Sequence, residues 1–131
     1  MRLVYSKTLR EHFEQPRHVG RLDPEAADVG TGSAGTQETG GVLRLQIQAD
    51  AAGQIKAACF KAYGPPALIA AGSWLAATIQ GLNLEAAAGL SHQPIAAALE
   101  LAPVQLHCAM LAEDALHAAI RNYKDKQGVN A

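Results

Sequence analysis

The chain has 131 residues, 49% hydrophobic and 18% charged, with a formal net charge of -1 at pH 7, which predicts one globular domain over residues 1–131. Its Lys and Arg residues are scattered along the sequence, so we expect no nucleic-acid partner. The longest apolar stretch, residues 65–77, is too short to span a bilayer and the N-terminus lacks a signal-peptide apolar region, so we expect no membrane partner and a cytoplasmic protein.

The first predicted element is a short amphipathic helix over residues 5–15. Leu9, His12 and Phe13 share one face at helical spacing, and Ser6 is a candidate N-cap. The following segment is rich in Gly, Pro, Asp and Thr, which predicts a loop with at most one short strand near residues 28–35. Its glycines lack the strand, helix and lysine that accompany a phosphate-binding loop.

The middle of the chain predicts an antiparallel hairpin. Leu43, Leu45 and Ile47 alternate with polar residues over 41–50, and residues 54–64 return as the partner strand after a turn at 51–53. The alternation predicts that one face of the hairpin is exposed to solvent. The other face then needs a cover of helices.

The rest of the chain is predicted to be helical, over residues 66–80, 84–89, 93–100 and 103–127. Because the strands precede the helices, we expect an α+β fold in which a small antiparallel sheet is covered on one face by helices. The last helix is the longest. Between strand and helix, the stretch "CFKAYGPPALIAAGSW" contains a sharp turn at Gly64, Pro65 and Pro66.

Three segments, "YSKTLREHFEQPRHVGRLD", "FKAYG" and "APVQLHCAMLAEDALHAAIRNYK", follow one another in an order that resembles the IscU-type iron–sulfur cluster assembly scaffolds, also found as the N-terminal part of NifU proteins. The resemblance runs from Tyr5 to Lys126. It implies the IscU/NifU-N-like fold, an iron–sulfur cluster or Zn as the bound metal species, and a cysteine desulfurase and a chaperone as partners. A homo-oligomer is also compatible with it.

The resemblance further implies a ligand set of three cysteines, an aspartate and a histidine. In this chain the first cysteine falls on Thr39, the aspartate on Gly41 and the second cysteine on Pro65. His107 and Cys108 remain. The resemblance also implies that Thr39, Pro65 and Cys108 converge at one end of the molecule. Because iron and zinc need several converging ligands, we expect that the protein does not hold a stable cluster alone.

Cys108 follows a predicted helix start and a histidine, both of which favour a thiolate. We therefore expect Cys108 to be partly exposed and more reactive than Cys59, which we place half-exposed on the solvent face of the second strand. The alternative is that Cys108 is a small buried core residue.

The remaining histidines and the acidic pair of the last helix give no converging site. His18 and His92 are expected in loops, and His117 is expected to be packed or solvated. Glu113 and Asp114 are adjacent in a helix and so diverge, which predicts a solvated helix face.

The segment Leu101–Gln105 matches three of the five residues of the motif by which the chaperone is implied to recognise scaffolds, and we expect it to be extended. Its missing proline and terminal cation weaken that expectation of chaperone binding.

Three functions follow. The first is an accessory or docking member of the iron–sulfur assembly pathway. The second is a sulfur carrier or metal-binding protein that uses Cys108 and His107. The third is a small-ligand or protein-binding module, whose pocket would be lined by four apolar residues, Pro65, Pro66, Ala67 and Leu68. No nucleophile, base and orienting group come together in the sequence, so we do not expect an enzyme.

Overall fold

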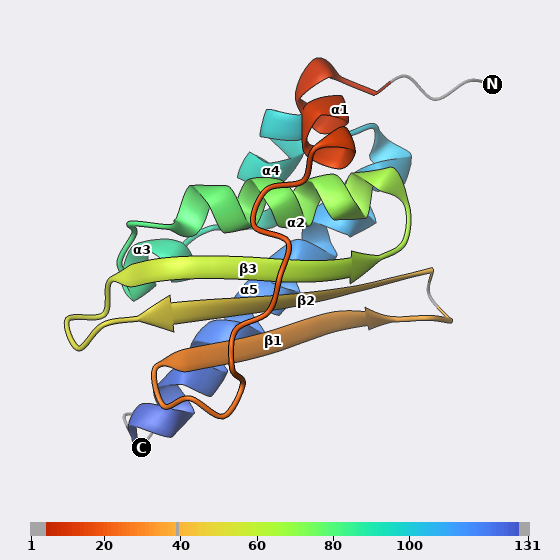
Figure 1. The fold of residues 1–131 in the computed structure, drawn as a ribbon. Helices are drawn as coiled ribbons and strands as arrows, with labels where there is room; N and C mark the ends of the chain where they lie inside the picture. The colour runs from red at the N-terminus through yellow and green to blue at the C-terminus, as the bar shows by residue number, and fades with distance from the viewer. Residues whose placement is uncertain (1–4, 39, 129–131) are drawn as a thin grey trace.

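The computed structural model describes residues 5–38 and 40–128, which form a three-stranded antiparallel sheet with helices packed on one face (Figure 1). The strands, in spatial order, are β1 (Val29–Thr36), β2 (Gly41–Ala49) and β3 (Ile55–Tyr63). The helices are α1 (Lys7–Glu14), α2 (Pro66–Ile79), α3 (Leu84–Ala88), α4 (His92–Leu99) and α5 (Leu106–Gln127), and a 3-10 turn, η1 (Pro103–Gln105), precedes α5. The predicted α+β fold with its long last helix is confirmed.

Helix α1 begins at its predicted cap. Ser6 Oγ accepts from the backbone N–H of Leu9 at 3.0 Å and donates to the carbonyl of Leu99 at 2.6 Å. The same hydroxyl therefore caps α1 and ties it to the end of α4. Leu9 and His12 are buried as predicted, whereas Phe13 lies at the margin of the apolar face with 37% of its surface exposed.

The core lies between the sheet and the helices α2 and α5. Leu43, Leu45 and Ile47 of β2 are fully buried, and the register places Leu45 opposite Phe60 and Ile47 opposite Ala58 of β3. Burial of each leucine or isoleucine contributes about 1.5–3 kcal/mol. The alternating pattern of β2 therefore faces the helices as predicted.

Strand β1 lies where a short strand was predicted, and it pairs with β2 from Gly41 to Gln48. Its close contact with α5 was not predicted. A Cβ atom built on Gly30 would lie 2.8 Å from Tyr123 Cβ, and one built on Gly32 would lie 2.8 Å from the carbonyl carbon of Ala118 and still closer to the backbone of Ala119. The absence of a side chain at these two glycines thus lets the backbone of α5 rest directly on the strand.

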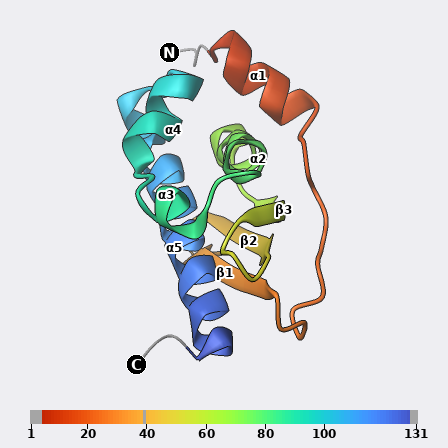
Figure 2. The same cartoon turned by 90° about the vertical axis from the view of Figure 1, so that its left-hand side faces the viewer.

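The outer face of the sheet is exposed over one half and covered over the other. The prediction of a solvent-exposed face is therefore wrong for the covered half. Figure 2 shows the segment that joins α1 to β1 running along the side of the sheet opposite α5. Gln46, which is 1% exposed, holds this segment. Its side chain accepts from the N–H of Leu22 at 2.8 Å and donates to the carbonyl of Leu22 at 2.9 Å and to Thr31 Oγ1 at 3.0 Å. The alternation along β2 predicted that Gln46 is hydrated, but its buried side-chain amide is hydrogen-bonded to protein groups instead of water.

Among the helices of the described residues, none combines the length and the apolar character needed to cross a membrane.

Candidate functional site

The start of β2, the turn from β3 into α2 and the start of α5 lie at the same end of the molecule (Figure 1). Gly41 and Pro65 are direct neighbours there, because a Cβ atom built on Gly41 would lie 3.7 Å from Pro65 Cδ. The same atom would lie 2.7 Å from Leu68 Cδ2. The packing of Leu68 therefore leaves little room for a side chain at position 41.

A pocket of about 190 Å³ connects the turn to α5. Its wall consists of Tyr5, Pro65, Pro66, Ala67, Val104, Gln105, His107 and Cys108. The predicted convergence of Pro65 with Cys108 is confirmed, and Gly41 lies beside Pro65. Thr39, the remaining predicted ligand position, lies outside the described residues. Pro65, Pro66 and Ala67 line the pocket as predicted, whereas Leu68 does not, because it is fully buried in the core.

Cys108 is the thiol of this pocket, and it is buried. Only 1% of its surface is exposed, and burial raises the pKa of its thiol to about 11. Its Sγ lies 3.7 Å from Nε2 of His107, which is exposed. The expectation of a partly exposed, activated Cys108 is wrong, because the side chain lies on the inward face of α5, where desolvation opposes the thiolate more than the helix start favours it.

The donor set of the pocket does not fit a metal cluster. Gly41 has no side chain, and Pro65 has no nitrogen or oxygen in its side chain and no N–H. Of the residues that line the pocket, Cys108 and His107 alone carry the soft sulfur and imidazole donors that iron and zinc prefer. Within residues 5–38 and 40–128, no three His, Cys, Asp or Glu residues are grouped so that they could hold a metal ion. Two neighbouring donors do not complete the four-ligand set of a zinc site or an iron–sulfur cluster.

Cys59 is not half-exposed as predicted. It lies on the outer face of β3, as expected, but it is buried, and its Sγ lies 3.8 Å from Gln46 Oε1. Burial raises the pKa of this thiol as well. The sequence did not predict this burial, because the segment around Leu22, which bonds to Gln46 and approaches the Cys59 thiol, lies far from Cys59 in the chain.

A buried polar cluster joins α1 to α2. His12 Nδ1 lies 2.7 Å from Ser73 Oγ, which also accepts from the N–H of Arg17 at 2.8 Å. The Arg17 guanidinium lies 3.2 Å from His12 Nε2. A neutral imidazole with its proton on Nδ1 satisfies all three contacts, because Nε2 then accepts from Arg17. Burial, with a smaller contribution from Arg17, lowers the pKa of His12.

Glu113 is not part of a solvated face. Its carboxylate accepts from the backbone N–H and the ring Nδ1 of His92, and the hydrogen bond from the ring lowers the pKa of Glu113. His92 is the first residue of α4 rather than a loop residue. Glu113 therefore caps α4 from α5, a contact over 21 residues that local spacing could not predict.

The two other histidines outside the clusters are placed as follows. His117 is packed, with Nε2 3.1 Å from the carbonyl of Ala88. His18 lies outside the helices and strands, as predicted.

The segment Leu101–Gln105 is not extended throughout. Pro103 to Gln105 form η1, and Gln105 Oε1 accepts from the N–H of Ala102 at 2.8 Å. This closed turn points Val104 outward, with 67% of its surface exposed.

Comparison with known proteins places the chain in a family. The family described as "NifU-like N terminal domain" matches residues 4–130. The "Iron-sulfur cluster assembly scaffold protein IscU" of Haemophilus influenzae is 45% identical over 126 residues, which are 96% of this chain and 100% of that protein. The protein of the same name from Azotobacter vinelandii is 44% identical, over 97% of this chain and 99% of its own length. The "Iron-sulfur cluster assembly enzyme IscU" of Drosophila melanogaster is 44% identical, over 95% of this chain and 80% of its own.

Solved structures agree on the fold. The N-terminal part of a NifU-like protein from Brucella abortus superposes with a TM-score of 0.68 at 18% identity, over 92% of this chain and 94% of that one. A putative iron–sulfur cluster assembly scaffold protein from Fervidobacterium islandicum superposes with a TM-score of 0.65 at 17% identity, over 88% of this chain and 96% of that one. With a family match over nearly its whole length and relatives at 44–45% identity, the chain belongs to the NifU-like N-terminal domain family.

Proposed function

We propose that this protein acts in iron–sulfur cluster assembly as an accessory member that has the shape of the scaffold but does not hold a cluster by itself. The role in assembly is supported by the names of relatives that match it over nearly their whole length. The accessory role is supported by one observation. At the pocket where the ligand positions meet, Gly41 and Pro65 offer no donor and the remaining thiol, Cys108, is buried.

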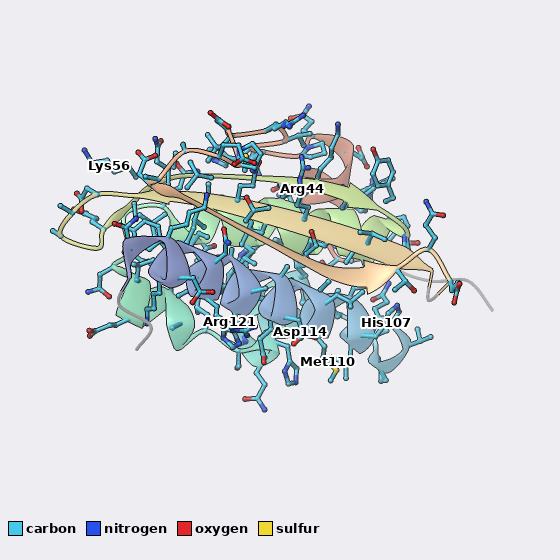
Figure 3. The ribbon with its side chains drawn as sticks, turned by 90° about the horizontal axis from the view of Figure 1, so that it is seen from below. Arg44, Lys56, His107, Met110, Asp114 and Arg121 are labelled. Carbon is cyan, nitrogen blue, oxygen red and sulfur yellow. The ribbon has the colours of Figure 1, made fainter. Side chains whose placement is uncertain are left out.

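A protein partner suits this role better than a bound metal. Leu106 and Met110 lie on the outer side of α5 with 38% and 50% of their surfaces exposed, and Val104 precedes them. Figure 3 shows Met110 pointing away from the sheet near the start of the helix. Exposed apolar side chains beside a pocket are typical of protein contacts. A cysteine desulfurase is the partner that the role in assembly requires, and a chaperone is less favoured because η1 folds its predicted recognition segment.

The sulfur-carrier alternative is weaker. A carrier must present a thiolate to a persulfide donor, and burial both raises the pKa of Cys108 and removes its access. The pocket itself, at about 190 Å³, is smaller than the roughly 300–1,000 Å³ of common small-ligand sites. Neither alternative has an observation that favours it over the accessory role, and the proposal assigns the protein no catalytic step.

Reconstitution tests the proposal. The purified protein is incubated with ferrous iron and sulfide under reducing, oxygen-free conditions, and its visible absorption and its iron and sulfide content are measured. We expect no stable absorption band and no stoichiometric iron. A band with stoichiometric iron and sulfide in the unmodified protein would contradict the proposal.

A gain-of-ligand variant provides the control. In Thr39→Cys/Pro65→Cys two further thiols are placed at the implied ligand positions, and we expect this variant to take up iron and sulfide under the same conditions. Gly41→Asp is tested separately, because its side chain would collide with Leu68 and disturb the core. A colourless double variant that remains folded would show that the missing cysteines are not the reason for the absence of a cluster.

A further inference from the structure

A second pocket, of about 320 Å³, lies on the open half of the outer sheet face. It is lined by Arg21, Ser33, Val42, Arg44, Lys61 and Tyr63. It shares no residue with the pocket at Pro65 and Cys108. Figure 3 shows Arg44 on the side of the sheet turned away from α5, whose outer residues Met110 and Arg121 point in the opposite direction.

Three cations meet in this pocket without a counter-charge. The register places Arg44 directly opposite Lys61 on β3 and Ser33 on β1. Opposed side chains of neighbouring strands have Cβ atoms about 5 Å apart, and like charges at that distance destabilise a sheet. Arg21 adds a third positive charge from the segment that crosses the sheet, and no carboxylate lines the pocket.

The cations also have no ion-pair partner elsewhere in the described part of the chain. The ion pairs found there join Arg10 to Glu14 and His92 to Glu113. The whole sequence has 12 acidic and 11 basic residues, so its charges could balance locally. A cluster of three cations that repel one another in a concave surface is typical of a site for an anion.

We propose that this pocket binds a small polyvalent oxyanion, one that carries two or more phosphate or carboxylate groups. Arg44 supplies a planar fork that matches two oxygens of one group, and Lys61 supplies a compact charge for a second. Ser33 adds a hydroxyl donor from the neighbouring strand. The exposed ring of Tyr63, with 66% of its surface accessible, forms an apolar rim beside these groups.

The dimensions favour a small ligand over a macromolecule. The volume lies within the range of small-molecule sites, and the crossing segment held by Gln46 bounds the open half of the sheet face. A nucleic acid requires a longer basic stripe than three side chains, and the net charge of the whole chain is -1.

Isothermal titration calorimetry of the full chain at low salt tests the proposal, with pyrophosphate in one arm and citrate in the other. We expect at least one anion to bind and to bind more weakly as salt is added. The arm with the tighter binding identifies the ligand group as phosphate or carboxylate. In Arg44→Gln/Lys61→Gln the affinity is expected to fall about tenfold or more. The matched control Lys7→Gln/Arg10→Gln loses the same charge on α1 and is expected to change the affinity less than about twofold.

Three results would overturn the proposal. They are the absence of binding in both arms, an equal loss in the control variant, and tighter binding of poly-glutamate than of either small anion, which would indicate an acidic protein surface as the ligand. Circular dichroism checks that the variants are folded. If the double variant unfolds, Arg21→Gln tests the same pocket from the segment that crosses the sheet. The affinity for the anion is then expected to fall about threefold, and an unchanged affinity would contradict the proposal.

Discussion

The contact between β1 and α5 leads to a quantitative prediction for Gly32→Ala. A Cβ atom at this position would lie 2.8 Å from the carbonyl carbon of Ala118 and closer still to Ala119 N and Ala115 O. Ordinary contacts of a Cβ atom are 3.4–4 Å. The neighbours are backbone atoms of a helix, which cannot rotate away as a side chain can. The helix or the strand must therefore move by more than about half an ångström.

This displacement separates two elements that share the core. Introducing one methyl group into a well-packed core costs about 1–3 kcal/mol, and rigid neighbours put the cost at the upper end. We expect Gly32→Ala to lower the free energy of unfolding by about 3 kcal/mol or more, a large part of the 5–15 kcal/mol of a typical domain.

Chemical denaturation followed by circular dichroism measures this loss. Gly20→Ala is the matched control, because a Cβ atom on Gly20 has no neighbour within 4 Å, and we expect a change within about 0.5 kcal/mol or a small gain. If Gly32→Ala costs less than about 1 kcal/mol, α5 does not rest on the backbone of β1 and the packing described above is wrong.

Three further predictions concern other contacts. Because burial and Arg17 lower the pKa of His12, the unfolded chain takes up the proton first, so stability falls as the pH decreases below 6.5. His12→Gln should remove that part of the slope, whereas the exposed His107→Gln should keep it. Alkylation of Cys108 near pH 8 should be at least about a hundredfold slower in the native than in the unfolded protein, since the pKa rises from 9.0 to about 11; equal rates would show that the thiol is accessible. Lys126→Met should lower the unfolding free energy by about 1 kcal/mol, because Nζ donates to the carbonyls of Pro24, Ala26 and Val29. An unchanged denaturation midpoint would contradict this.

Local patterns sufficed for much of the fold. The alternation of Leu43, Leu45 and Ile47 predicted a strand with its apolar side toward helices, and Ser6 marked the start of α1. In both cases the physical cause lies within a few residues. Side chains alternate between the two faces of a strand, and the Ser6 hydroxyl bonds to an N–H three positions later.

Long-range contacts account for the errors. The contact of Gly30 and Gly32 with α5 was not predicted, because α5 lies more than 80 residues away in the chain. Cys59 was expected to be half-exposed, because the segment that contains Leu22 reaches it from another part of the chain. At the site, the resemblance to the scaffold family predicted that Pro65 and Cys108 meet. It could not predict the burial of Cys108, which depends on how the helix after η1 is rotated against the core.

The glycine contact also determines how the pocket at Pro65 and Cys108 can deform. The wall that carries Cys108 belongs to α5, which is stiff, because its backbone already touches β1 and its far end is tied down by Lys126. The opposite wall is the turn at Pro65, where no side chain caps the start of α2. Expansion of the pocket, whether under a bound ligand or through substitution, is therefore expected in the walls outside α5, which are the turn, Tyr5 and η1, and not in the helix that bears the thiol.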